Sequence, residues 1–314
     1  MKKLTRSECA EILLRHDNYA IVTHRRPDGD TIGSSAVLCM GLRQLGKNAH
    51  ILENPEITPK YTHLHKGLTK AAAEAGDFVI TVDVASPGML PDHFKELSFD
   101  LRIDHHGNAT SFTPVELVEP EAAACGEIVY GVLTQMGAEL DIPMANALYT
   151  AVSTDTGCFR YANTTADTFA VAAACTKAGA EVFNINQALF ETNSLARLKV
   201  QAWMLQNAIF LQDGKIAICP LPKAVEQACG ATEDDLENIS GFPRTIEGVK
   251  LAVTIREEGA GRVKMSVRAV PGQDASALCS KFGGGGHKGA AGASMNMTMD
   301  EAVKAVIAEL PVIV

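Results

Sequence analysis

The sequence predicts an α/β protein with a mostly parallel sheet flanked by helices, joined by a helical linker to a smaller α/β domain. Up to residue 193, strand-type apolar runs alternate with helical patterns, the order typical of a parallel sheet with crossover helices. After residue 208, strand runs are separated by tight turns instead. With 314 residues, the chain is also longer than one ordinary domain.

The first domain opens with an amphipathic helix pattern over 5–16 and a β-type run over 19–23. A turn rich in charged residues follows, and helical spacing then covers 32–45, where Gly46 is a natural stop. The later apolar runs predict strands at 49–52, 78–82 and 101–103, and the later periodic patterns predict helices at 122–136, 143–152 and 165–178.

A helical pattern over 194–208 separates this region from the second domain, and we expect it to join the two. The predicted domains are therefore 1–193 and 209–314, with 194–208 as a helical linker. The second domain should contain strands at 215–219, 249–256 and 263–270, a hairpin turn at Gly259-Ala260-Gly261, and a last helix capped by Thr298 with Glu301.

Composition and charge exclude several classes of protein. Hydrophobic residues make up 46% and charged residues 21% of the chain, as in a folded globular protein, and no apolar run approaches the length of a membrane span. Eight cysteines stand singly, which is typical of a reducing compartment, so we expect a cytoplasmic protein. The net charge of −9 disfavours long double-stranded nucleic acid, because such a surface repels a polyphosphate chain.

Metal-ligand residue types follow three separate strand-type runs. Because neighbouring parallel strands end at one edge of a sheet, these side chains can share a crevice although they lie far apart in sequence. A further aspartate follows a helical pattern. The residues are His24, Asp28 and Asp30 after the first run, Asp83 after the second, Asp104, His105 and His106 after the third, and Asp155 after the helix.

Each of these residues alone has an ordinary structural explanation, since aspartate is common in turns and paired histidines are often exposed. Together they would repel and desolvate one another unless cations neutralised them. Two divalent ions carry four positive charges, which match Asp28, Asp30, Asp83 and Asp155. Carboxylate and imidazole ligands without thiolate favour manganese, with magnesium, cobalt or iron as alternatives, and such a pair of ions supports phosphoester hydrolysis.

A glycine run near the C-terminus offers a second place for a phosphate. Gly283, Gly284, Gly285 and Gly286 lie between a helical pattern and a small-residue strand, which favours a shaped turn over a flexible loop. Successive backbone N–H groups there could form an anion-binding nest. Positive charge could be added by His287, Lys288 and Arg268, although a solvated surface lysine is the simpler explanation of Lys288.

The motifs His24-x-x-Pro27-Asp28-Gly29-Asp30-x-x-Gly33-Ser34, Asp83, Asp104-His105-His106 and Asp155 resemble the four motifs of the DHH phosphoesterase family. The run from Gly283 to Gly292 resembles the substrate-binding motif of the DHHA1 domain, so the resemblance spans nearly the whole chain. Size and layout are most similar to the branch of bacterial oligoribonucleases that are also 3'-phosphoadenosine 5'-phosphate (pAp) phosphatases.

This resemblance implies two metal-ion sites that share Asp83. His24, Asp28 and Asp83 would hold one ion, while Asp30, Asp83, His105 and Asp155 would hold the other. The resemblance also implies that His106 faces the scissile phosphate and that Asp104 orients a histidine ring. The roles of Arg25 and Arg26 are left open.

The implied substrates are short RNA oligonucleotides or small nucleotides, and the protein could act as a homodimer. One alternative is a phosphodiesterase for cyclic di-AMP or its linear product pApA, whose motifs are the same. A pyrophosphatase would lack the glycine-rich motif, and long-strand exonucleases of the family carry further domains. A non-catalytic nucleotide or RNA sensor is the alternative from another class, but a sensor would not need a complete ligand set.

Overall fold

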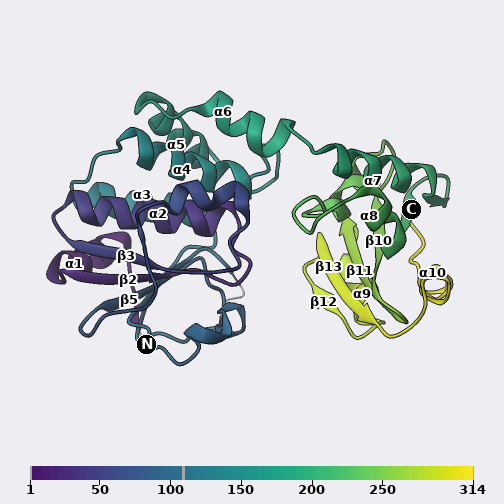
Figure 1. Cartoon of the computed structure of the whole chain (residues 1–314), viewed down its shortest axis with the longest axis horizontal. Helices are drawn as coiled ribbons and strands as arrows, with labels where there is room; N and C mark the ends of the chain where they lie inside the picture. Colours follow the sequence, from purple (N-terminus) through teal and green to yellow (C-terminus); the bar gives the residue numbers. More distant parts are fainter. Residues whose placement is uncertain (1, 108–109, 314) are drawn as a thin grey trace. The chain divides into compact units, whose positions relative to one another are not determined.

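The computed structural model describes residues 2–107 and 110–313. The chain divides into two compact units, Met1–Thr192 and Asn193–Val314, which are considered separately. The predicted α/β class with a mostly parallel sheet is confirmed (Figure 1). Within the described residues, none of the helices is long and apolar enough to span a membrane.

The first unit contains a seven-stranded sheet in the order β1-β7-β6-β5-β2-β3-β4, and every strand pair in it is parallel. Its strands are β1 (Lys2–Lys3), β2 (Asn18–Val22), β3 (Asn48–Leu52), β4 (Thr69–Lys70), β5 (Phe78–Val82), β6 (Leu101–Asp104) and β7 (Val115–Val118). Its helices are α1 (Arg6–Arg15), α2 (Gly29–Gln44), α3 (Cys125–Gln135), α4 (Ile142–Asp155), α5 (Ala166–Lys177) and α6 (Val182–Asn186). Shorter helical segments are η1 (Pro59–His65), η2 (Pro87–Met89), η3 (Asp92–Phe94) and the π-helical η4 (Gln187–Glu191).

The strand order reverses between β2 and β5, because the chain moves outward from β2 through β3 and β4 and then outward on the other side from β5 through β6 and β7. A crevice forms at the carboxyl ends of the strands at such a point, and α/β proteins place their ligand sites there. The residues that follow β2 and β5 therefore have the position expected of a binding site.

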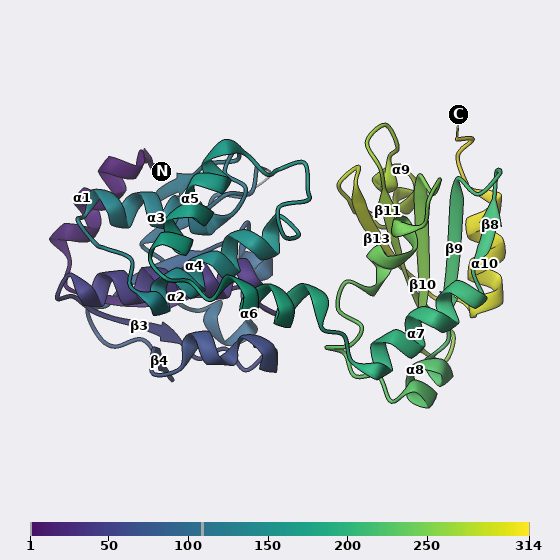
Figure 2. The same ribbon diagram turned by 90° about the horizontal axis from the view of Figure 1, so that it is seen from above.

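The two faces of this sheet are covered differently. Ile21, Ile80 and Ile103 point to the face on which the helices pack, and they belong to the main core of the unit. Figures 1 and 2 show α2, α3 and α4 stacked on this side of the strands. The alternate residues, such as Val22 and Val79, face a smaller core built with the segments that contain η2 and η3.

Helices α2 and α4 pack very closely because glycines line the contact. A Cβ atom at Gly33 would lie 2.3 Å from the Ala147 carbonyl oxygen, and one at Gly29 would lie 2.4 Å from Thr154 Oγ1. Larger side chains would therefore force the helices apart. The close approach brings the first turn of α2, with Asp30, next to the last turn of α4, with Asp155.

The predicted bounds of these two helices were wrong at the ends that carry the ligand residues. Helix α2 begins at Gly29 rather than 32, because Asp28 Oδ1 accepts hydrogen bonds from the N–H groups of Asp30 and Thr31 and so caps the helix. Helix α4 runs to Asp155 instead of ending at 152, so this aspartate is the last residue of the helix and does not follow it.

The second unit contains a mixed six-stranded sheet in the order β12-β13-β11-β10-β9-β8, in which only the β9–β10 pair is parallel among the pairs described. Its strands are β8 (Ile209–Leu211), β9 (Ile216–Leu221), β10 (Leu251–Gly259), β11 (Arg262–Ala269), β12 (Gly285–Gly286) and β13 (Ala290–Met295). Its helices are α7 (Leu195–Gln206), α8 (Lys223–Cys229), η5 (Ile239–Thr245), α9 (Ala275–Ser280) and α10 (Met299–Ala308).

Helix α7 corresponds to the helix that the sequence predicts between the domains. Its residues Val200 and Met204 are fully buried and pack with Cys219 and Leu221 of β9 in one core cluster. The helix is therefore part of the second unit. The predicted hairpin is also present, since β10 and β11 pair antiparallel around residues 259–262.

Candidate metal centre

The three strands whose ends carry ligand residues are neighbours in the sheet, in the order β6-β5-β2. His24 follows β2, Asp83 follows β5, and His105 follows β6. Asp83 N donates to the Ile103 carbonyl oxygen over 2.9 Å, which holds the end of β5 against β6. The convergence predicted from the sequence is therefore present in the fold.

One group of potential ligands comprises His24, Asp28 and Asp83, whose ligand atoms all lie within 4.8 Å of one another. His24 Nε2 is 3.9 Å from Asp28 Oδ1 and 3.7 Å from Asp83 Oδ2. His24 Nδ1 lies 2.7 Å from the Arg25 carbonyl oxygen, which favours a proton on Nδ1 and leaves Nε2 as a lone-pair donor.

A second group comprises Asp30, His105 and Asp155. His105 Nε2 lies 3.7 Å from Asp30 Oδ2 and 3.5 Å from Asp155 Oδ2, and it is also 3.5 Å from Asp83 Oδ1. His105 Nδ1 is 3.1 Å from the Ala122 carbonyl oxygen, so its Nε2 too is directed at the carboxylates as a lone-pair donor. Asp83 lies between the two groups and offers an oxygen to each.

Asp30 is fixed by hydrogen bonds from an element far away in sequence. Its oxygens accept from the N–H groups of Cys125 over 2.7 Å and Gly126 over 3.1 Å at the start of α3, and from Ser34 Oγ over 2.8 Å. The N-terminus of a helix stabilises a negative charge. The carboxylate is therefore held in one orientation before any ligand binds.

The electrostatics of the cluster are unfavourable without a cation. Burial, with the neighbouring charge of Asp30 added, raises the pKa of Asp83 well above its usual range, and the same two causes raise the pKa of Asp155 to about 7. Asp83 Oδ1 is buried without a hydrogen-bond partner among the described residues, and its backbone has a φ of 60°, a strained conformation for a residue other than glycine. Divalent cations would reduce the repulsion between the carboxylates and would give Asp83 Oδ1 a partner. These residues therefore fit the metal ions that the motifs imply.

His106 pairs with Asp104 and also belongs to the cluster, since its Nδ1 is 3.6 Å from Asp83 Oδ1 and Asp83, His105 and His106 form a third group of potential ligands. Asp104 Oδ1 lies 2.7 Å from His106 Nδ1 and also accepts the N–H groups of His105 and His106. This hydrogen bond raises the pKa of His106. Burial acts to raise the pKa of Asp104, but the hydrogen bond and the charge of His106 outweigh it, so the pKa of Asp104 is lowered. Asp104 thus orients His106, while His105 is oriented by a carbonyl group.

The loop between β2 and α2 is held by residues that the motifs did not single out. Asn54 Nδ2 donates to Thr23 Oγ1 over 3.0 Å and to the His24 carbonyl oxygen over 2.8 Å. Arg25 Nη2 donates to Asp92 Oδ1 over 2.9 Å, so Arg25 anchors the loop to the segment with η3. Arg26 is exposed and has a φ of 47°. Only tertiary contacts identify these supports.

In the second unit, the glycine run forms the turn between α9 and β13, as predicted. The N–H groups of Gly283, Gly284 and His287 donate to carbonyl groups of Ser280, Cys279 and Ala290, so those of Gly283 and Gly284 are already used and the predicted nest is wrong at these two glycines. A Cβ atom at Gly284 would lie 2.2 Å from the Gly292 carbonyl oxygen, which requires glycine there.

The side chains predicted to bind phosphate are nevertheless grouped around this turn. Gly285, Gly286, His287 and Lys288 are exposed. Arg268 on β11 pairs in register with Ala290 on β13, and Ala290 exchanges backbone hydrogen bonds with His287. Arg268, near the end of β11, is therefore close in register to the turn that carries His287 and Lys288.

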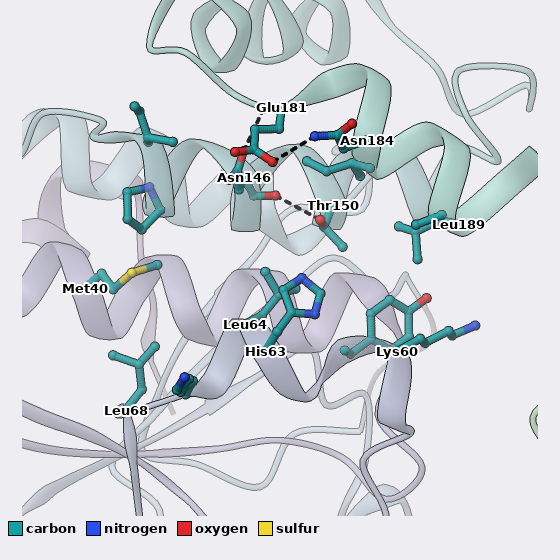
Figure 3. Close-up of a pocket in the computed structure, with 16 residues that line it drawn as sticks. Met40, Lys60, His63, Leu64, Leu68, Asn146, Thr150, Glu181, Asn184 and Leu189 are labelled. Carbon is teal, nitrogen blue, oxygen red and sulfur yellow. Dashed lines mark hydrogen bonds between the residues drawn. The ribbon is translucent and has the colours of Figure 1, made fainter. Parts of the chain in front are cut away.

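A cavity of about 620 Å³ lies elsewhere in the first unit, between η1 and the helices α4 and α6 (Figure 3). Met40, Leu64 and Leu189 contribute apolar surface, and the N–H group of Glu181 donates to Asn146 Oδ1 across from Met40 and Leu64. None of the described candidate metal ligands lines this cavity. The cavity is therefore distinct from the carboxylate cluster, and we assign it no part in the metal-ion chemistry.

Comparisons with known proteins agree with this geometry. Residues 18–152 match the N-terminal domain of the DHH family, and residues 221–310 match the DHHA1 domain. The chain is 33% identical over 293 residues to the bifunctional oligoribonuclease and PAP phosphatase NrnA of Thermus thermophilus, covering 91% of this chain and 87% of that protein.

Two solved structures share the fold. An exopolyphosphatase-related protein from Bacteroides fragilis superposes with a TM-score of 0.85 at 24% identity, covering 97% of this chain and 94% of that one. The exonuclease RecJ bound to manganese superposes with a TM-score of 0.52 at 15% identity, covering 99% and 96% of the two chains.

Proposed function

Because the chain belongs to the DHH family, we propose that it is a metal-dependent phosphoesterase that hydrolyses short oligoribonucleotides to mononucleotides and removes the 3'-phosphate from pAp. The observation that carries the proposal is the cluster of carboxylate and imidazole groups around the buried Asp83, whose mutual repulsion divalent cations would relieve. The substrates are those named for the NrnA relative, with which the chain shares both domains along most of its length.

We propose that the ligand sets are those that the family motifs imply. His24, Asp28 and Asp83 would hold one divalent ion, and Asp30, Asp83, His105 and Asp155 would hold a second. Manganese is favoured, with magnesium, cobalt or iron as alternatives. Ions held by these residues would supply positive charge to stabilise a phosphoryl group and would activate water for in-line attack.

The residues of the chain itself orient and hold protons around this centre. His24 and His105 keep Nδ1 protonated through carbonyl acceptors, so their Nε2 atoms face the carboxylates. His106 has its Nδ1 bound to Asp104, which leaves Nε2 to hydrogen-bond a phosphate oxygen or to donate a proton to the leaving oxygen. We propose that the unit Asn193–Val314 binds substrate through Arg268, Lys288, His287 and the turn of Gly284, Gly285 and Gly286.

A substrate panel with added Mn²⁺ tests this function. Initial rates would be compared for di- to pentaribonucleotides, pAp, cyclic di-AMP and pApA. We expect turnover of the short ribonucleotides and of pAp. Efficient cleavage of cyclic di-AMP with no turnover of short RNA would identify a cyclic dinucleotide phosphodiesterase, and binding without turnover of any substrate would identify a nucleotide sensor.

Turnover per strand end should be highest for di- to pentanucleotides and should fall for long RNA. The net charge of −9 repels phosphates that lie beyond the site, so affinity should not rise with length as it does for proteins with a basic track. Initial rates on end-labelled single-stranded RNAs of graded length, at fixed salt, measure this. Equal or rising efficiency with length would indicate a processive exonuclease.

His287→Ala should raise KM for nucleotides by about tenfold, the usual size of one lost charge-assisted contact, and leave bound manganese unchanged. His287 is exposed in the second unit, whereas every candidate metal ligand lies in the first. Metal analysis and Michaelis constants decide this. Lys264→Ala, an exposed position on β11, is the matched control; loss of manganese from the His287 variant, or unchanged kinetics, contradicts the assignment.

A further inference from the structure

Strand β6 carries a charged side chain where a buried strand would ordinarily be apolar. Arg102 lies two residues before Asp104, so both point to the same face of the sheet, opposite the helices. The Arg102 side chain is only 2% exposed, and that of Asp104 is fully buried. Burying a guanidinium is costly unless several partners compensate it, so its contacts indicate what it does.

The guanidinium of Arg102 joins several segments around the metal centre. Nη2 donates to Glu116 Oε2 over 3.0 Å, and Glu116 is the residue directly opposite on the neighbouring strand β7. Nη1 donates to the carbonyl oxygens of Ala85 over 3.2 Å and Thr110 over 3.0 Å. Ala85 follows the ligand Asp83, and Thr110 follows the two histidines, so one side chain ties both ligand-bearing loops to the sheet.

The same Nη1 atom lies 3.9 Å from Asp104 Oδ2. This oxygen is buried and accepts no hydrogen bond from the described residues, whereas Oδ1 accepts three from His105 and His106. Arg102 thus places a positive charge beside the oxygen of Asp104 that accepts no hydrogen bond. Arg102 offsets the negative charge of Asp104 on the side of Oδ2, while Oδ1 accepts the hydrogen bonds from His105 and His106.

We propose that Arg102 is a positioning residue of the metal centre, acting through Asp104 to fix His106. The contacts that matter run from Arg102 through Asp104 to the ring of His106, while Glu116 pairs with the side of the guanidinium that faces away from Asp104. The forked guanidinium suits this role because its separate N–H groups reach Glu116 and the two loop carbonyls together, which a single ammonium group cannot do. This assignment rests on the proposed phosphoesterase function, because its kinetic test uses phosphodiester substrates.

The variant Arg102→Met alone would leave the buried carboxylate of Glu116 without its cation, with only Ser111 Oγ and the N–H group of Phe112 as hydrogen-bond donors, so its loss of activity would prove little. The informative comparison is Glu116→Gln against the double variant Arg102→Met/Glu116→Gln, which contains neither charge. If Arg102 served only to neutralise Glu116, both variants would have the kcat of the wild type. For a positioning residue, we expect Glu116→Gln to keep its kcat and the double variant to lose about 10- to 100-fold, with KM within about twofold.

A second readout does not depend on catalysis. In metal-free protein with ¹⁵N-labelled histidine, the Nδ1 proton of His106 should resonate downfield because Asp104 accepts it, and its loss in His106→Ala assigns the signal. We expect this signal to persist in Glu116→Gln and to shift or broaden in the double variant. An unchanged signal, or a double variant with the kcat of Glu116→Gln, would overturn the proposal.

Arg102→Lys keeps the charge opposite Glu116 and serves if the double variant does not fold. We expect it to be folded, with kcat lowered by about tenfold. Wild-type kcat in folded Arg102→Lys would equally overturn the proposal. All rates are measured with Mn²⁺ on a diribonucleotide and on bis(p-nitrophenyl) phosphate. If the wild type cleaves only the synthetic diester, the proposed RNA substrate is refuted. The role of Arg102 can then still be tested with the synthetic diester.

Discussion

Asp83→Ala is expected to abolish turnover, lowering kcat/KM at least about 10³-fold, which corresponds to roughly 4 kcal/mol of lost transition-state stabilisation. Asp83 offers one oxygen toward His24 and the other toward His105, so its removal affects both ligand groups at once. The measurement is the rate on a diribonucleotide with Mn²⁺ in excess, together with metal content.

Asp83→Asn separates chemistry from folding. Asparagine tolerates the positive φ of this position better than alanine does, so the backbone should be retained. Because burial and neighbouring carboxylates raise the pKa of Asp83, its charge destabilises the metal-free fold, and metal-free Asp83→Asn should melt at a higher temperature than metal-free wild type. The control is Asp17→Ala, an exposed carboxylate of the same unit, which should keep full activity. Wild-type-like turnover in either Asp83 variant would refute the metal assignment.

Removal of metal by a chelator should abolish activity, and Mn²⁺ should restore it while raising the melting temperature. At about one hundred times its dissociation constant, one bound ion adds about 2.7 kcal/mol, which for a unit of this size raises Tm by roughly 5–10 °C. Enzyme dialysed against chelator and then titrated with Mn²⁺ gives both values. Full activity after exhaustive chelation would exclude the proposed mechanism.

The gain in Tm from Mn²⁺ should be larger at pH 8 than at pH 5. In the metal-free fold the pKa of Asp155 is about 7, compared with 3.8 in an unfolded chain, so between these pH values the folded protein holds a proton that the unfolded chain has lost. Stability of the metal-free protein therefore falls as pH rises through this window, and Asp83 acts in the same direction. Asp155→Asn should weaken this pH dependence. An equal Tm gain at both pH values would show that the carboxylates are not what the ions neutralise.

The sequence by itself determined the fold class and the candidate ligands. Strand-type runs that alternate with helical patterns predicted the parallel sheet, and ligand residue types after the runs at 19–23, 78–82 and 101–103 predicted one shared crevice. This worked because both signals are local: side-chain periodicity identifies a strand, and the residue after a strand lies at its carboxyl end. The glycine run was placed between a helix and a strand for the same reason.

Only the tertiary structure decided how the ligands are held. Asp104 and His106 are only two residues apart, but the carbonyl group that orients His105 belongs to Ala122, 17 residues further along the chain. The contact of Asp30 with the start of α3 joins residues 95 positions apart, and no local pattern predicts it. Neither does periodicity explain a buried Arg102, because an arginine on a strand ordinarily faces solvent. Burial, hydrogen bonding and charge compensation are properties of packed neighbours, so they emerge only when the elements are assembled.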